Sequence, residues 1–337
     1  MRRALPVICC TAALGGLLLL WPAAAIPQAK DKLPKVEPHT HKAYGEKLAE
    51  DVEFEMLPIP GGTYMIGNPN PKADESEKPQ RPVAVKPFWM GKCEVAWDEF
   101  DLYWENRPAG PPPRPEIGPK PAKLPDAITS PTPPYDDQTF GYGRKGYPVI
   151  AVSYHAAMEY CRWLSKKTGK AYRLPTEAEW EWAARAGSAN DAIPDVDDFW
   201  NAKNSKESPQ PVGKKKANAW GLHDIRGNVS EWCIDEYKKD FYSTLPADKL
   251  SLNPFSPPTE NRYPYTVRGG SWNDEPEKCT LTIRRGSSKT WLKRDPQRPQ
   301  SIWWMTDAEW VGFRIVRAVE EDERLKDVRS KVSWWSQ

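Results

Sequence analysis

The chain has 337 residues, with 48 lysines and arginines against 46 aspartates and glutamates, and a formal net charge of +2. Removal of a leader that contains Arg2 and Arg3 leaves a balanced charge, which gives no electrostatic reason for binding nucleic acid or an anionic membrane surface. The 17 tryptophans and 36 prolines are many for this length and predict a loop-rich fold held by buried aromatic side chains.

The N-terminus has the three parts of a secretory signal peptide. Met1-Arg2-Arg3 is basic, residues 4–21 are apolar, and small residues follow as far as Ala25. The alternative is a membrane anchor, but the apolar run ends at Pro22 and no basic stop-transfer cluster follows directly. We therefore expect residues 1–25 to be cleaved. The mature protein is then secreted or periplasmic and is not an integral membrane protein.

Residues 26–52 are polar and lysine-rich, and we expect them to form a tether. The folded domain is expected over residues 53–318. Within residues 54–67, two short strands are predicted around a Pro-Gly-Gly turn. Further strands are predicted at residues 83–85 and 88–90.

Aromatic residues recur at helical spacing in residues 97–106, which predicts a helix whose aromatic stripe is more typical of a core than of a binding site. Prolines are dense in residues 108–134, and such a segment does not form a helix or a central strand. We expect a Pro-rich insert on the surface, and a docking site for a partner is the alternative reading.

Two further helices have clear start signals. Ser153 is placed to cap the first, which is expected to stop at Gly169. Thr176 and Glu179 form a predicted capping box at the start of the second, which runs to Gly187.

The remaining sequence, to about residue 317, has the pattern of short strands and loops. Residues 319–337 are a charged tail that we expect to be helical.

Four cysteines lie outside the leader, and four cysteines allow three pairings among which the sequence does not choose. They are Cys93, Cys161, Cys233 and Cys279. No histidine, cysteine and carboxylate spacing typical of a metal centre is found, which argues against zinc and non-haem iron.

Five segments in chain order resemble the sulfatase-modifying-factor family, the family of the formylglycine-generating enzymes. They are Gly61–Gly67, Tyr172–Glu181, Gly221–Trp232, Arg268–Trp272 and Gly312–Arg314. The resemblance implies an α+β, loop-rich formylglycine-generating-enzyme fold, distantly like a C-type lectin. The two disulfides of that family are not kept, because Ile315 and Ala184 stand where one cysteine of each pair is expected.

The activity implied by the resemblance is oxidation of a cysteine in a sulfatase peptide to formylglycine, with oxygen and a copper(I) ion held by two cysteine thiolates. Cys279 matches the second of these cysteines and Ser271 a serine of the pocket, but Asp274 stands at the position of the first cysteine. A carboxylate is a hard ligand and suits copper(I) poorly. The plain structural alternatives are a small buried residue for Cys279 and a turn residue for Ser271.

The resemblance also implies a calcium site in residues 224–231. Asp224 and Glu231 would supply side-chain oxygens, and Gly227 and Val229 would supply backbone carbonyls. Hard oxygen ligands in a sharp loop suit calcium. The alternative is a capped turn whose carboxylates bind backbone amides.

We therefore expect a protein- or ligand-binding module without standard formylglycine chemistry, with a sulfatase or another exported protein as partner. The alternative is a formylglycine-generating oxidase that uses oxygen and copper. A third possibility is a relative with a different oxidative chemistry. Some family members of that kind carry an added iron-binding helical domain, and this sequence shows no such domain.

Overall fold

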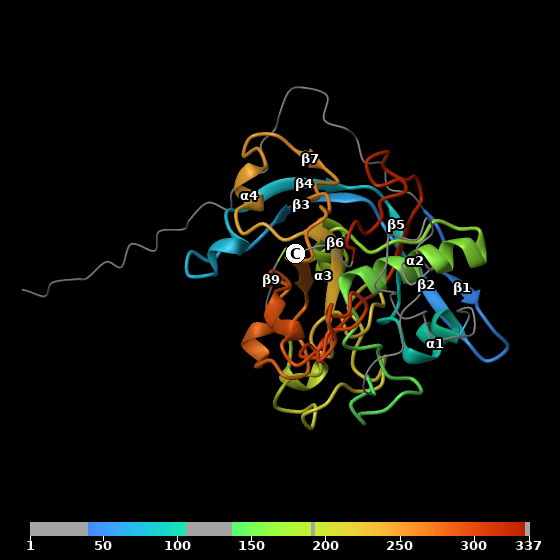
Figure 1. Ribbon diagram of the computed structural model, residues 1–337. Coiled ribbons are helices and arrows are strands. Elements are labelled where there is room, and N and C mark those ends of the chain that lie inside the picture. The colour runs from blue at the N-terminus through green and yellow to red at the C-terminus, as the bar shows by residue number, and fades with distance from the viewer. Residues whose placement is uncertain (1–39, 106–136, 190–192, 334–337) are drawn as a thin grey trace, which may run out of the picture.

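The computed structural model describes residues 40–105, 137–189 and 193–333 (Figure 1). The signal peptide predicted at residues 1–25 and the Pro-rich insert predicted at residues 108–134 lie outside these ranges. Within them, no helix combines the length and the apolar character needed to cross a bilayer.

Three small sheets form the frame of the domain, with strand orders β1-β2-β5-β11, β10-β6-β8-β9 and β3-β4-β7. Figure 1 shows β3, β4 and β7 lying together at one end, and β1 and β2 beside α1 and α2. The strands are β1 (Tyr44–Lys47), β2 (Glu53–Ile59), β3 (Gly62–Ile66), β4 (Arg81–Val85), β5 (Phe88–Gly91), β6 (Ser230–Glu236), β7 (Ser251–Leu252), β8 (Tyr265–Arg268), β9 (Arg284–Gly286), β10 (Val311–Gly312) and β11 (Val316–Ala318).

The two strands predicted around the Pro-Gly-Gly turn are present as β2 and β3, but they do not pair with each other. β2 pairs with β1 and β5, whereas β3 pairs with β4. The turn therefore carries the chain from one sheet into another.

The predicted tether is wrong at Tyr44–Lys47, because this segment is β1 and pairs in antiparallel register with β2. The side chain of Tyr44 also holds β1 on the domain. Its ring packs edge-on against Trp89 with ring centroids 5.7 Å apart, and its hydroxyl lies 2.9 Å from that of Tyr172. The folded domain therefore begins earlier than residue 53.

The helices are α1 (Trp97–Glu105), α2 (Tyr154–Thr168), α3 (Glu177–Arg185) and the single turn α4 (Phe241–Thr244). The predicted start signals of α2 and α3 are confirmed. Ser153 Oγ accepts the N–H of Ala156, and the capping box of Thr176 and Glu179 has both of its hydrogen bonds. Each satisfies N–H groups that a helix start leaves without partners.

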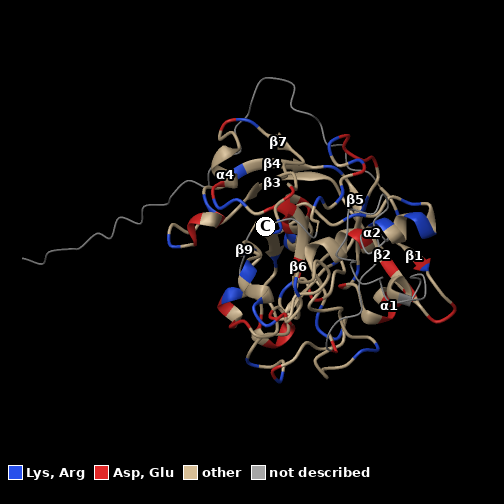
Figure 2. Ribbon diagram, in the orientation of Figure 1, with Lys and Arg blue, Asp and Glu red and all other residues tan. Residues whose placement is uncertain are grey.

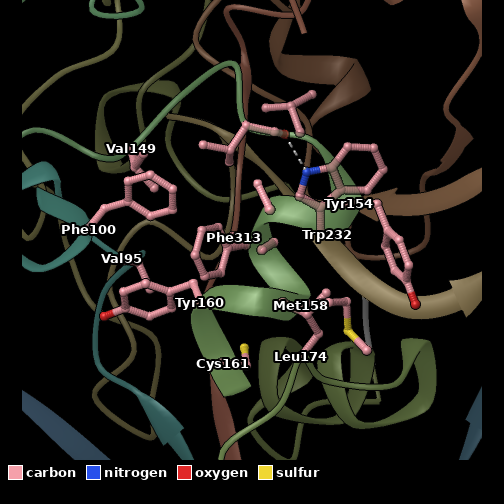
Figure 3. Packing of buried hydrophobic residues seen from close by; sticks show 14 of the residues in the cluster. Val95, Phe100, Val149, Tyr154, Met158, Tyr160, Cys161, Leu174, Trp232 and Phe313 are labelled. Carbon is pink, nitrogen blue, oxygen red and sulfur yellow. Dashed lines mark hydrogen bonds between the residues drawn. The ribbon is translucent and has the colours of Figure 1, made fainter. Parts of the chain in front are cut away.

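The larger core cluster is rich in aromatic rings, as the composition predicts (Figure 3). Phe100 of α1 stacks on Tyr160 of α2 with ring centroids 5.7 Å apart. The indole of Trp232, completely buried, donates to the carbonyl of Val152 at 2.9 Å. The aromatic stripe of α1 is therefore core, as predicted.

The four cysteines of the described ranges are free thiols. Buried ion pairs link α3 to the sheet that contains β8 and β9. Glu177 of α3 contacts Arg268 of β8 and Arg284 of β9, and all three side chains are shielded from solvent. Elsewhere, basic and acidic residues are interspersed over the elements (Figure 2).

The prediction of a helical tail is wrong for residues 319–333, which form turns. Leu325 and Val332 enter the core separately, and Arg324 donates to the carbonyls of Leu252 and Asn253. These tertiary contacts replace the local pairs that would support a helix.

Candidate functional site

A glycine turn after β8 forms the base of the site. Gly269 and Gly270 have φ angles of 96° and 73°, and a Cβ on Gly270 would lie 2.8 Å from both Cα and Sγ of Cys279. Glycine is therefore required for this close approach. The hydroxyl of Ser230 donates to the carbonyl of Gly270 at 2.9 Å and fixes the turn on β6.

Asp274, at the position expected for the first cysteine, is bound by two side chains. Its Oδ2 accepts from Ser271 Oγ at 2.6 Å, and Arg285 donates through Nη1 at 2.9 Å and through Nη2 at 2.5 Å. Arg285 also lies over the ring of Trp310 at 5.4 Å. A bidentate arginine gives both charge and fixed geometry to the carboxylate, so position 274 is the acidic half of an ion pair.

The thiol of Cys279 is completely buried beneath this pair. Its Sγ lies 3.8 Å from the carbonyl oxygens of Ser271 and Glu275. Burial, and then the negative charge of Asp274, raise the pKa of Cys279 to about 12. The thiol is protonated at neutral pH, and a protonated thiol is neither a strong nucleophile nor a good metal ligand.

The structure thus brings Ser271, Asp274 and Cys279 together, as the sequence predicts. The donor set does not fit copper(I), however. It offers one protonated thiol and one carboxylate whose charge is met by Arg285, where a soft cation needs two thiolates. Arg285 itself was not predicted, since nothing in the sequence pattern marks it as the partner of Asp274.

The second predicted site lies in the turn before β6. Asp224 has a φ of 53°, and its Oδ2 accepts the N–H of Gly213 at 2.6 Å. Its Oδ1 is buried without a hydrogen-bond partner. A Cβ on Gly227 would lie 1.8 Å from the carbonyl oxygen of Trp200, so this position also requires glycine.

Glu231, the other predicted carboxylate, is already engaged by side chains. Arg314 donates to both of its oxygens at 2.6 Å, and the indole of Trp180 donates to Oε2 at 2.7 Å. The carboxylate and the guanidinium are both fully buried. Glu231 therefore acts as the internal partner of Arg314.

Glu94, which sequence reasoning missed, is a third buried carboxylate and lies against this turn. Its Oε1 accepts from the amide of Asn228 at 3.1 Å, and its Oε2 is buried without a partner. Burial, and then the charge of Asp224, raise the pKa of Glu94 well above its ordinary value. Burial likewise raises the pKa of Asp224, with the charge of Glu231 adding to it.

The fit of this turn to calcium is therefore partial. The unpartnered oxygens of Asp224 and Glu94 are of the kind that a hard cation would satisfy. Against this, Glu231 is committed to Arg314. In residues 40–105, 137–189 and 193–333, no three His, Cys, Asp or Glu side chains converge as ligands.

Comparison with known proteins places this geometry in context. The sequence matches the family described as "Sulfatase-modifying factor enzyme 1-like domain" over residues 45–319. It is 27% identical over 267 residues to the formylglycine-generating enzyme of Thermomonospora curvata, an alignment that covers 66% of this chain and 84% of that enzyme. It is also 35% identical over 136 residues to the serine/threonine-protein kinase Pkn1 of Chlamydia trachomatis, of which the alignment covers only 20%.

Two solved structures share the fold. Treponema denticola variable protein 1 has a TM-score of 0.59 at 21% identity, with 83% of this chain and 100% of that chain covered. PvdO from Pseudomonas aeruginosa has a TM-score of 0.57 at 25% identity, with 84% and 99% covered. The predicted α+β, loop-rich fold is confirmed by these similarities and by the sheets and helices described above.

Proposed function

The chain belongs to the sulfatase-modifying-factor family, and from this premise we propose that it is an exported binding module without standard formylglycine chemistry. Its partner would be a sulfatase or another exported protein. The signal peptide predicted at residues 1–25 supports secretion or export to the periplasm.

The observation that carries this proposal is the ion pair between Asp274 and Arg285, which are joined at 2.5 Å. Formylglycine chemistry in this family depends on a pair of thiolates. Here one thiol is replaced by a carboxylate with its own cation, and the remaining thiol of Cys279 is held protonated by burial. A site without two soft ligands has no means of holding copper(I) tightly.

The alternative function is the formylglycine-generating oxidase. It is supported by the similarity to the Thermomonospora curvata enzyme and by the positions of Cys279 and Ser271. In that case Ser271 would line the substrate pocket and Cys279 would be one of the ligands of the copper ion.

One experiment separates the two functions. The mature chain is incubated with a cysteine-containing sulfatase peptide, copper(I) and oxygen, while oxygen consumption and the mass of the peptide are followed. We expect neither oxygen uptake nor a mass change above those of the Cys279→Ser variant. Conversion of the peptide by the wild type alone would establish the oxidase.

We also propose calcium as a structural ion of the turn that contains Asp224. The buried, unpartnered Oδ1 of Asp224 supports a cation there, together with Oε2 of Glu94 and the carbonyls of Gly227 and Val229 as the predicted backbone ligands. Calcium would contribute to folding and take no part in catalysis.

A further inference from the structure

A surface cavity of about 330 Å³ lies between residues 138–140 and residues 294–306. Its volume falls at the lower end of the range of roughly 300–1,000 Å³ that is usual for small-molecule sites. None of its lining residues belongs to the Ser271–Asp274–Cys279 site or to the Asp224 turn. The cavity is therefore separate from both predicted sites.

One wall of the cavity is rigid before any ligand arrives. The carboxylate of Asp295 accepts the N–H groups of Gln297 at 2.9 Å and of Ser301 at 2.8 Å, which closes the loop between them. The side chain of Gln300 donates to the carbonyl of Leu292 at 2.6 Å. A preformed wall reduces the entropy that binding costs.

The other polar wall is held by an ion-pair network. Arg294 donates to Asp307 at 2.7 Å and to Glu309 at 3.0 Å. At the base, Trp304 is fixed by its packing against Trp97 and Trp104, with ring centroids 6.4 Å and 5.3 Å away.

The charges of the lining favour an uncharged ligand. Among the described residues that line the cavity, Arg294 and Asp295 are the two with charged side chains, and their formal charges cancel. Arg294 is already paired with two carboxylates, and Asp295 is satisfied by backbone N–H groups. Both charges are therefore already compensated by groups of the protein itself.

The remaining lining combines aromatic surface with side-chain amides. Phe140 and Trp304 contribute aromatic ring atoms to the lining, and the side-chain amide of Gln297 carries two donors and an acceptor. The amide of Gln297 makes no hydrogen bond with any described residue. A sugar ring matches this set, because its hydroxyls both donate and accept while its C–H face packs on aromatic rings.

We infer that this cavity binds an uncharged saccharide of one or two rings. The inference rests on the proposed function, because it names the class of ligand that the binding module would take. Saccharide binding is measured independently of the peptide assay, so either proposal can fail while the other stands.

The test is saturation-transfer NMR on the mature chain with millimolar methyl glycosides of glucose, galactose, mannose and N-acetylglucosamine, and with cellobiose and maltose. We expect transfer to at least one of them. Gln297→Ala and Phe140→Ala should reduce that transfer at least fivefold. Lys293→Ala, which alters an exposed neighbour outside the cavity lining, should leave it unchanged.

The Gln297 variant decides the test if Phe140→Ala does not fold, since the Gln297 side chain makes no hydrogen bond within the part of the chain that the structure describes. Methyl glucuronide serves as the charged match of methyl glucoside and should bind at least fivefold more weakly. Absence of transfer to every sugar, transfer undiminished in Gln297→Ala, or equal binding of the glucuronide would each overturn the inference.

Discussion

Arg268 of β8 and Glu181 of α3 form an ion pair of 2.5 Å with both side chains completely shielded from solvent. The same glutamate accepts from Arg185 and from the backbone of Gly67. Because the glycine turn of the candidate site begins directly after Arg268, this pair anchors the site to α3.

Removal of the Glu181 carboxylate should therefore lower the stability of the folded state. We expect Glu181→Ala to lower the free energy of unfolding by about 3–5 kcal/mol, because the buried guanidinium of Arg268 then keeps only Glu177 as its acidic partner and Arg185 loses its ion pair with Glu181. Glu75→Ala is the matched control, since Glu75 is mostly exposed in its pair with Lys78. Denaturant unfolding measures both, and a similar small effect for the two variants would contradict the anchoring role.

Asp274→Cys should restore copper(I) binding. The substitution places a second thiol beside Cys279, and Arg285 then lies next to that pair and favours its thiolate form. Competition with a chromogenic copper(I) chelator measures the affinity, with Asp274→Cys/Cys279→Ser as the control for adventitious binding. Wild-type affinity equal to that of Asp274→Cys would show that Asp274 is compatible with the metal.

Calcium should stabilise the chain through Asp224. A hundredfold excess over the dissociation constant raises the free energy of unfolding by about 2.7 kcal/mol. Thermal melts with calcium and with chelator should differ for the wild type and for Asp248→Ala, an exposed acidic control. The difference should disappear in Asp224→Ala; coincident wild-type curves would remove calcium from the account.

Glu99 should make stability fall as the pH rises. Burial raises the pKa of Glu99 from 4.5 to about 7, so between these values the folded state holds a proton that the unfolded state has released. The stabilisation is complete below pH 4.5 and is lost as the pH passes 7. The group accounts for about 3 kcal/mol over this window.

Glu99→Gln keeps the shape of the side chain and removes its titration. Its free energy of unfolding, measured by denaturant between pH 4.5 and 7, should fall less steeply than that of the wild type. Parallel curves for the two proteins would show that Glu99 titrates normally.

Local sequence signals predict the starts of the helices α2 and α3. Thr176 and Glu179 are three residues apart, so their capping box follows from the backbone geometry of any helix start. The grouping of Ser271, Asp274 and Cys279 could equally be predicted from the sequence, because it depends on one turn and a known motif.

Contacts between segments that are distant in the chain could not be predicted from the sequence. Glu94 and Asn228 are 134 positions apart, and only the folded chain places this carboxylate in the turn of Asp224. Arg285 reaches Asp274 because β9 pairs with β8. The residue types at positions 274 and 285 do not predict the register of that pairing. The helical tail failed for the same reason, since Leu325 packs into a core contributed by other elements.

The pairing of β5 with β11 also bears on how the protein is made. Residues 88–90 pair with residues 316–318, so the first sheet closes only after residue 318 has been synthesised. Contacts of such long sequence separation slow folding, because loop closure precedes any gain from pairing. A growing chain therefore cannot complete this sheet before residues 316–318 are available to pair with residues 88–90.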